Sequence, residues 1–321
     1  MDKSAKLQET ARRLLTEGKV RSVVACRKGR LPFYLQPAVI TDPSKAGKAV
    51  FTPLAGQNLV KIAEKAEKPA AVAVKGCDVG SLVDLFQEHQ IKRSDIFIIG
   101  MACPGVLKED ALEKDGRFKI SAVTDVREEK GRIMAVTSSG AFEMPASLLM
   151  EKCLTCKVHT PAMYDELIGD DQAPAGGAPG QVKSSDLHSM TPGERRDFWL
   201  RMFSRCIRCN ACRQACPLCY CNECVMDESM PRWVTAENNA VENLFHQMIR
   251  ALHSAGRCTG CRECERVCPV GIPLSLLYDR IADEAKELFG HEAGIDPESR
   301  PALLAYLMND PGRESCLGGK E

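Results

Sequence analysis

The sequence predicts two domains of different class: an α/β domain in the N-terminal half and a mostly α-helical domain, built around cysteine clusters, in the C-terminal half. Apolar strand-like segments alternate with helix-like segments up to about residue 168, which is typical of a parallel sheet with crossover helices. The C-terminal half instead contains two cysteine runs of identical spacing. A chain of 321 residues has room for two such cores.

The cysteine runs share the pattern Cys-x-x-Cys-x-x-Cys-x-x-x-Cys-Pro. Their members are Cys206, Cys209, Cys212 and Cys216 in the first run, and Cys258, Cys261, Cys264 and Cys268 in the second. In ferredoxins this spacing lets three close thiolates bind one 4Fe-4S cluster, while the fourth, before proline, binds the other cluster. We therefore predict two 4Fe-4S clusters with crossed ligation, in which Cys268 completes the first and Cys216 the second. Two zinc sites are the alternative, but zinc usually takes Cys-x-x-Cys pairs that lie well apart.

A further group of cysteines belongs to the first half of the chain, namely Cys77, Cys103, Cys153 and Cys156. Residues 70–75 and 95–100 read as neighbouring parallel strands. Cys77 and Cys103 lie just past their carboxyl ends, where open α/β sheets bind ligands. The other two cysteines form a Cys-x-x-Cys pair that suits chelation. We predict that the four thiolates hold a third 4Fe-4S cluster. The alternative is a set of buried cysteines plus a redox-active pair.

The sequence contains 17 cysteines, which in a reducing compartment are better explained as metal ligands than as disulfides. Cys219, Cys221 and Cys224 extend the first run. They either ligate a further metal, with Cys316 or a partner subunit supplying a fourth thiolate, or are thiols packed near a cluster. Cys26 and Cys316 are isolated in the sequence, and we expect a structural role for them.

Residues 1–168 are expected to form the α/β domain. In chain order we predict a helix over 4–17 that ends at Gly18, a strand over 20–27, a helix over 59–66, a strand over 70–75, a helix over 82–89 that Asp78 can cap, and a strand over 95–100. The strand–helix–strand order makes a βαβ unit. Residues 116–145 suggest a small antiparallel appendage of short strands.

Residues 169–192 are rich in Gly, Pro, Ala and Ser, so we predict a linker there. The helical domain follows over 193–289. Thr191 and Glu194 have capping-box spacing at its start. Within it, helical spacing of apolar residues predicts a helix over 236–253, and a further helix is expected over 274–288 after Pro273. Residues 290–321 are expected to form a tail with one helical turn around 302–308, which could serve as a docking segment.

Composition excludes several classes of function. Lys plus Arg and Asp plus Glu both number 43, so the formal net charge is zero, and we expect neither nucleic-acid binding nor a polybasic membrane patch. Residues 1–17 are charged and amphipathic, unlike a signal peptide. No run approaches the roughly 18–20 apolar residues of a membrane span. We therefore expect a cytoplasmic protein. No Gly-rich phosphate loop and no Ser/His/Asp arrangement can be assigned, so no catalytic residue is predicted.

Parts of the chain resemble known families. Residues 11–27, 70–105 and 153–169 are similar to the coenzyme F-420 hydrogenase/dehydrogenase beta-subunit family, which includes the beta subunits of F-420-dependent formate dehydrogenases. The resemblance implies a flavoprotein with an iron–sulfur cluster in the same domain, and it supports the third cluster, since the family's short cysteine segments match the four cysteines of the first half. Residues 195–275 resemble the helical two-cluster ferredoxin domains of heterodisulfide reductase and succinate dehydrogenase iron–sulfur subunits.

These observations predict an electron-transfer beta subunit of an anaerobic oxidoreductase complex. The implied partner is a formate dehydrogenase, a hydrogenase or a heterodisulfide-reductase-like assembly. FAD is expected in the α/β domain, because a two-electron carrier needs an organic cofactor to split its electron pair for a cluster. The crevice past Cys77 and Cys103, with a helix N-terminus near Asp78, is the expected pyrophosphate site. The alternatives are a flavin-free electron wire that links two redox enzymes, and a redox-sensing or zinc-scaffold protein.

Overall fold

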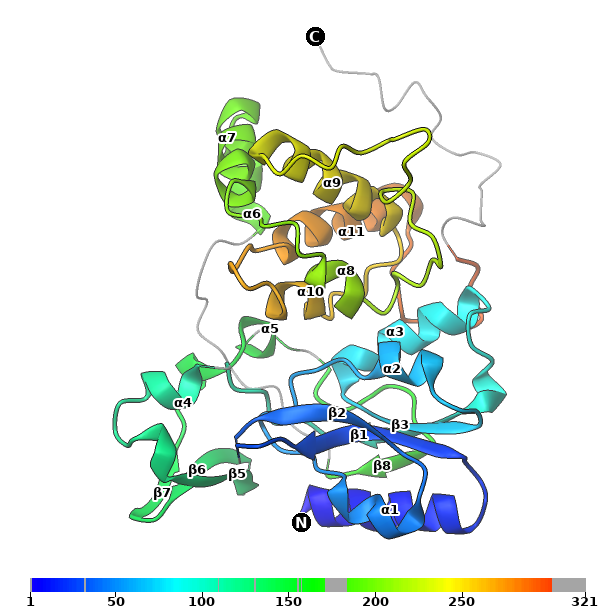
Figure 1. The fold of residues 1–321 in the computed structure, drawn as a ribbon, viewed down its shortest axis with the longest axis vertical. Coiled ribbons are helices and arrows are strands. Elements are labelled where there is room, and N and C mark those ends of the chain that lie inside the picture. The colour runs from blue at the N-terminus through cyan, green and yellow to red at the C-terminus, as the bar shows by residue number, and fades with distance from the viewer. Residues whose placement is uncertain are drawn as a thin grey trace. The chain divides into compact units, whose positions relative to one another are not determined.

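The computed structural model describes residues 2–31, 33–108, 110–129, 131–154, 156, 158–170 and 184–301 (Figure 1). The chain divides into two compact units, of which the first comprises Met1–Leu82 with Gln90–Gln181 and the second Val83–His89 with Val182–Glu321. None of the described helices combines the length and the apolar composition of a membrane span.

A five-stranded sheet of order β2-β1-β3-β4-β8 forms the centre of the first unit. Its strands are β1 (Ser22–Lys28), β2 (Leu35–Ile40), β3 (Ala70–Val74), β4 (Ile96–Met101) and β8 (Glu166–Ile168). Strands β1, β3, β4 and β8 run parallel, whereas β2 pairs antiparallel with β1 at the edge. Every residue of β3 is buried, as expected for an apolar central strand covered on both faces.

Helices cover the two faces of this sheet. Helix α1 (Lys3–Thr16) lies on one face, while α2 (Val60–Lys65) and the first turns of α3 (Gly76–Gln87) lie on the other (Figure 1). The Asp2 side chain caps α1 by accepting from the backbone N–H groups of Ser4 and Ala5. The expected helix over 82–89 begins earlier, at residue 76, so that Asp78 lies within its first turn instead of preceding the helix.

The predicted antiparallel appendage is a three-stranded sheet in the first unit. It contains β5 (Val123–Glu129), β6 (Arg132–Thr137) and β7 (Gly140–Glu143), in that order. Two short helices flank it in sequence, α4 (Ala111–Lys114) and α5 (Glu151–Leu154). Short 3-10 helices occur at Pro43–Lys48, Arg93–Asp95, Ile120–Ala122 and Ala146–Leu148.

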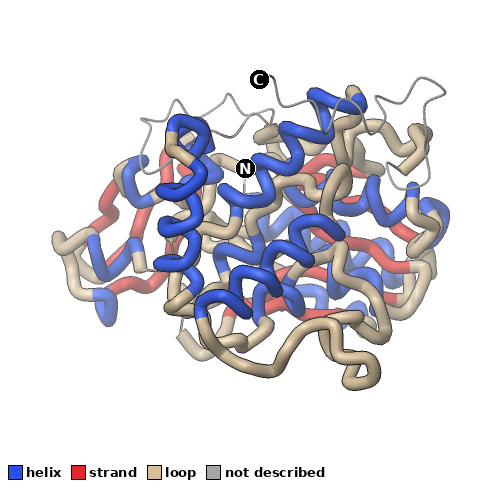
Figure 2. The backbone as a smooth tube through the Cα atoms, turned by 90° about the horizontal axis from the view of Figure 1, so that it is seen from above, coloured by secondary structure: helices blue, strands red, loops and turns tan. Residues whose placement is uncertain are grey.

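The second unit is helical, as the sequence predicts. Its helices are α6 (Ser184–Ser189), α7 (Pro192–Phe203), α8 (Ala211–Ala215), α9 (Ala240–His253), α10 (Glu263–Arg266) and α11 (Ser275–Phe289). The segment between α8 and α9 is loop and turn throughout. Figure 2 colours the helices, strands and loops of the chain. Thr191 and Glu194 form the predicted capping box at the start of α7. Phe203 of α7 is fully buried in the unit's core, which also contains Cys212 and Tyr278.

The predicted linker over 169–192 contains α6, because Leu187 packs into the helical core and the segment is therefore not extended throughout. Residues 171–183 of that linker, and the predicted helical turn around 302–308, lie outside the described residues.

Candidate iron–sulfur and cofactor sites

The two cysteine runs are built alike in backbone conformation. Two residues after the first cysteine of each run, and again four residues after it, φ is positive: 52° at Arg208 and 58° at Asn210 in the first run, 66° at Gly260 and 55° at Arg262 in the second. Positive φ is uncommon for residues other than glycine. In both runs a short helix follows, α8 or α10, and the fourth cysteine comes directly before proline. The two runs therefore form equivalent loops, as two sets of cluster ligands would require.

One small cavity of the second unit is lined by cysteines from both runs. The first run contributes three of them and the second run one, namely Cys206, Cys209, Cys212 and Cys268. These residues are the crossed set that the spacing assigns to one cluster. His246 and Gln247 of α9 also line this cavity. Burial and three neighbouring arginines lower the pKa of His246 to about 4, so its ring is neutral near pH 7.

The other crossed set is also gathered in space. Burial and the nearby thiols of Cys261 and Cys258 raise the pKa of Cys264. The pKa of Cys216 is raised by a hydrogen bond to Cys219, by burial and by the nearby Cys261, which belongs to the other run. Among the described residues, no three His, Cys, Asp or Glu side chains converge closely enough for a single metal ion. Ligation by these two cysteine sets stays a prediction.

The surroundings of the first cavity fit an anionic cluster. Arg250 of α9 is only 3% exposed, and its Nη1 lies 3.1 Å from the Cys212 sulfur. Within the described part of the chain, no carboxylate pairs with this guanidinium. A buried cation is costly unless an anion compensates it. Four thiols beside an uncompensated buried cation are therefore a donor set and an electrostatic setting that suit a 4Fe-4S cluster.

A second small cavity, in the first unit, gathers the remaining predicted ligands. It is lined by Cys77 at the start of α3, Cys103 after β4, and Cys153 and Cys156 around the end of α5. The Cys153 sulfur accepts from the Val106 N–H at 3.4 Å. Desolvation raises the pKa of Cys103 to about 11, an effect that the nearby Lys75 partly opposes. Four thiols from three segments thus face one cavity, as a cluster would require.

The expected pyrophosphate site at the start of α3 is wrong. Asp78 is fully buried there, and its Oδ2 lies 2.6 Å from Nζ of Lys75, which is 4% exposed. A Cβ added at Gly76 would lie 1.8 Å from the Val158 carbonyl oxygen. The carboxylate of Asp78 already occupies this helix N-terminus, and protein atoms cover it. The site therefore offers an anionic ligand neither free positive charge nor space.

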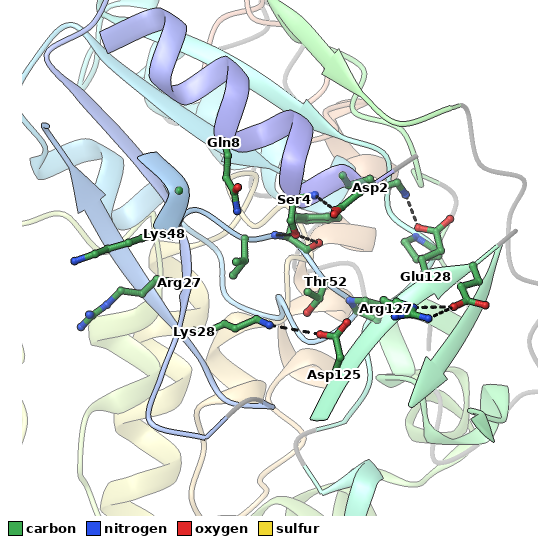
Figure 3. Close-up of a pocket in the computed structure, with 17 residues that line it drawn as sticks. Asp2, Ser4, Gln8, Arg27, Lys28, Lys48, Thr52, Asp125, Arg127 and Glu128 are labelled. Carbon is green, nitrogen blue, oxygen red and sulfur yellow. Dashed lines mark hydrogen bonds and ion pairs between the residues drawn. The ribbon is translucent and has the colours of Figure 1, made fainter. Parts of the chain in front are cut away.

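The first unit contains a much larger cavity, of about 1000 Å³ (Figure 3). Its walls come from the start of α1, the end of β1, residues 47–53, Pro104 and strand β5. Three lining cations are paired with carboxylates: Lys3 with Glu128, Lys28 with Asp125, and Arg127 with Glu129. The other two, Arg27 and Lys48, lie at one edge of the cavity, with their charged ends directed away from the other labelled residues (Figure 3), and no described carboxylate pairs with either.

The walls of this large cavity are held in place by hydrogen bonds. The Ser4 hydroxyl accepts from the Phe51 N–H and donates to the Phe51 carbonyl, both at 3.0 Å. Gln8 donates to the Ala49 carbonyl at 2.9 Å. The loop over 47–53 is thereby fixed to α1. Sequence reasoning missed this cavity, because its residues come from segments far apart in the chain and carry no motif.

Comparison with known proteins supports the iron–sulfur assignment of the second unit. A family model described as a 4Fe-4S dicluster domain matches residues 202–272. The beta subunit of F-420-dependent formate dehydrogenase from Methanocaldococcus jannaschii is 24% identical, and the match covers 91% of each chain. Subunit beta of F-420-dependent formate dehydrogenase 1 from Methanococcus maripaludis is 26% identical, with 90% of each chain covered.

Among solved structures, a chain of the xenon-derivatized F-420-reducing NiFe hydrogenase complex from Methanosarcina barkeri matches with a TM-score of 0.40 and 16% identity. This match covers 48% of the present chain and 59% of that chain, which is less than two thirds of its length. The two formate dehydrogenase matches extend along almost the whole sequence and confirm the resemblance on which the sequence prediction rested. The chain is thus similar along almost its whole length to beta subunits of F-420-dependent formate dehydrogenases, and its match to a 4Fe-4S dicluster domain indicates an iron–sulfur electron-transfer protein.

Proposed function

We propose that this chain exchanges electron pairs with a soluble two-electron carrier through FAD bound in the large cavity of the first unit, and exchanges single electrons with a partner subunit through three 4Fe-4S clusters. The partner is a formate dehydrogenase, a hydrogenase or a heterodisulfide-reductase-like assembly. One observation carries the proposal: the large cavity and the four-cysteine cavity lie next to each other in the same unit. Pro104 lines the first, and the adjacent Cys103 lines the second.

The large cavity fits a flavin nucleotide in size and charge. Its volume of about 1000 Å³ is at the upper end of small-molecule sites. Its lining carries five cations, Arg27 and Lys48 among them, against four carboxylates, and this excess of positive charge suits a diphosphate. When bound, FAD supplies the conversion between two-electron and one-electron transfer.

The chain's own residues would place the cofactor beside the third cluster. Lys3 donates to the Ala102 carbonyl at 2.6 Å and pairs with Glu128, so it ties strand β5 to the segment that precedes Cys103. These contacts hold the cavity wall and the cysteine loop in a fixed relation. A fixed short distance between donor and acceptor is what electron transfer needs.

The surface of the second unit fits membership of a complex. Along α9 an exposed apolar stripe is formed by Val241, Phe245, Met248 and Leu252. The buried face of the same helix carries His246 and Gln247, which line the first cluster cavity. Exposed apolar patches of this kind mark contacts with other proteins. The stripe therefore supports a partner subunit that docks close to a cluster.

The experiment is to purify the protein without oxygen, denature it and measure released flavin. Reduction of a viologen dye by reduced F-420 and by NADH then identifies the carrier. We expect about one FAD for each chain and activity with one of the two donors. Full cluster content with no flavin, and no activity with either donor after FAD is added, would leave only the flavin-free electron wire.

A paired substitution locates the flavin. Replacement of both Arg27 and Lys48 by Gln removes the two cavity cations that no described carboxylate compensates. We expect weaker FAD retention with unchanged iron content. The matched control is Lys45→Gln, an exposed lysine of the neighbouring 3-10 helix that already pairs with Asp42. Equal flavin loss in the control, or none in the double variant, would place the cofactor elsewhere.

The third cluster has its own test in the full chain. Three clusters require about twelve irons, and two require about eight. We expect the double variant Cys103→Ala/Cys153→Ala to lower the iron content from about twelve to about eight irons for each chain. A parent protein with eight irons, unchanged by these substitutions, would contradict the third cluster.

A further inference from the structure

Arg250 stands between the two cysteine sets of the second unit. Its guanidinium contacts Cys212, a member of the first set, through Nη1 to the sulfur at 3.1 Å and through Nη2 to the carbonyl at 3.2 Å. Its Nη2 also lies 4.0 Å from the sulfur of Cys219, whose backbone N–H donates to the carbonyl of Cys216, a member of the other set, at 3.2 Å. One cation therefore lies close to residues of both proposed clusters.

The burial of this cation is not explained by ordinary protein partners. Besides Cys212, the groups near its donors are the Gln247 side-chain oxygen at 2.9 Å and the Cys219 sulfur at 4.0 Å. For Nε no acceptor lies within reach in the described part of the chain. Hydrogen bonds to neutral acceptors do not offset the free-energy cost of desolvating a guanidinium that is 3% exposed. The compensation must come from anions, and the cysteine sets are the groups beside it that can supply negative charge.

Tyr278 completes the surroundings of Arg250. The guanidinium carbon lies 5.8 Å from the centre of the Tyr278 ring, within the range of a cation–π contact. Tyr278 is itself 5% exposed. Burial raises the pKa of its phenol, so the ring shields Arg250 from water without neutralising it. The positive charge therefore acts in a medium of low dielectric constant, where its influence on neighbouring groups is strong.

We propose that Arg250 sets the reduction potentials of both clusters of the second unit, by stabilising the reduced and more negatively charged form of each. This inference rests on the two clusters proposed above. Arg250 acts as a positioning and tuning residue and transfers no electron itself. Each cluster accepts one electron, and the fixed cation makes that acceptance more favourable at the two sites together. Net charge and hydrogen bonds to cluster sulfurs are known determinants of such potentials.

The experiment is a redox titration of the anaerobically purified full chain, followed by electron paramagnetic resonance. Arg250→Gln removes the charge but keeps a hydrogen-bond donor, and Arg250→Lys keeps the charge. At an effective dielectric constant of about 20, a unit charge within roughly 12 Å changes a one-electron equilibrium about tenfold. We compare the variants at the midpoint potential of the parent protein. For Arg250→Gln we expect the ratio of reduced to oxidised cluster to be at least tenfold lower there, for both clusters. That is a shift of about 59 mV to lower potential. Arg250→Lys should shift both potentials less.

The matched control is Arg205→Gln, which removes an exposed arginine that donates to the Gly271 carbonyl at 3.0 Å. Water screens this charge, so we expect little change in either reduction potential.

Unchanged potentials in Arg250→Gln, with iron content at the parent level, would overturn the inference while leaving the clusters intact. If Arg250→Gln loses iron and Arg250→Lys keeps it, the charge requirement is supported. Equal iron loss in both would show that Arg250 acts through its shape and would overturn the inference. A parent protein without iron would overturn the clusters themselves.

Discussion

The ion pair between Lys75 and Asp78 gives a sharp stability prediction for the first unit. Both side chains are almost wholly buried, and their charged atoms lie 2.6 Å apart. In Asp78→Ala the Gln57 carbonyl, at 2.8 Å, is the one hydrogen-bond partner that the ammonium keeps among the described residues. Removing one partner of a buried ion pair costs about 3–5 kcal/mol. We therefore expect the free energy of unfolding of the first unit to fall by that amount.

The assay is anaerobic urea unfolding of the intact protein, followed by circular dichroism and cluster absorbance. With a slope of about 2 kcal/mol per molar urea, the midpoint of the first unit should fall by about 2 M. The transition of the second unit serves as an internal reference, because two units need not unfold together.

A double variant separates the charge from the packing. Lys75→Met with Asp78→Leu removes both charges and keeps similar volume, and it should regain most of the lost stability. Glu67→Ala is the control, since its pair with Arg21 has exposures of 60% and 66%, and such pairs contribute about 0–1 kcal/mol. If Asp78→Ala leaves the midpoint unchanged, or if the double variant is no more stable than the single one, the reasoning about this pair is refuted.

Three further predictions concern other parts of the chain. Cys216→Ala should damage the cluster held by Cys258, Cys261 and Cys264, as judged from the resonance signals; damage to the cluster of its own run would show that ligation is not crossed. Thr191→Ala removes the capping box of α7 and should destabilise the second unit by about 1 kcal/mol in thermal unfolding, whereas an exposed Arg196→Ala should not. Gly76→Ala forces a Cβ against the Val158 carbonyl and should cost about 1–3 kcal/mol together with loss of iron from the first unit; unaltered iron content and melting temperature would argue against the close approach.

Sequence patterns predicted the elements whose signals are local. The apolar run of β3 and the capping box before α7 identify a strand and a helix without tertiary information. Strand β8 was missed because it has three residues and exists through its pairing with β4. Strand β2 was missed because Pro37 argues against a central strand, and β2 is tolerated only as the edge.

The candidate sites show the same division between local and non-local information. Cysteine spacing predicted which thiols line the small cavity of the second unit, because ligand loops are local motifs. The four cysteines of the first unit were instead predicted from the two strand ends and a Cys-x-x-Cys pair. Helix α9 was predicted from apolar spacing, but Met248 and Leu252 of that pattern are exposed, and Asn243 and Arg250 are buried. Burial of the polar face depends on what the helix packs against, which the sequence of the helix does not contain. The large cavity depends in the same way on segments that meet only in the fold.

The central claim is a flavin linked to three one-electron clusters in one chain. The most direct test is an anaerobic reductive titration of the purified protein, with the electrons taken up by each chain counted from absorbance. One flavin takes two electrons and each cluster takes one, so the account predicts about five electrons for each chain. An uptake of about three would contradict the flavin, and an uptake of about two would contradict both the flavin and the third cluster.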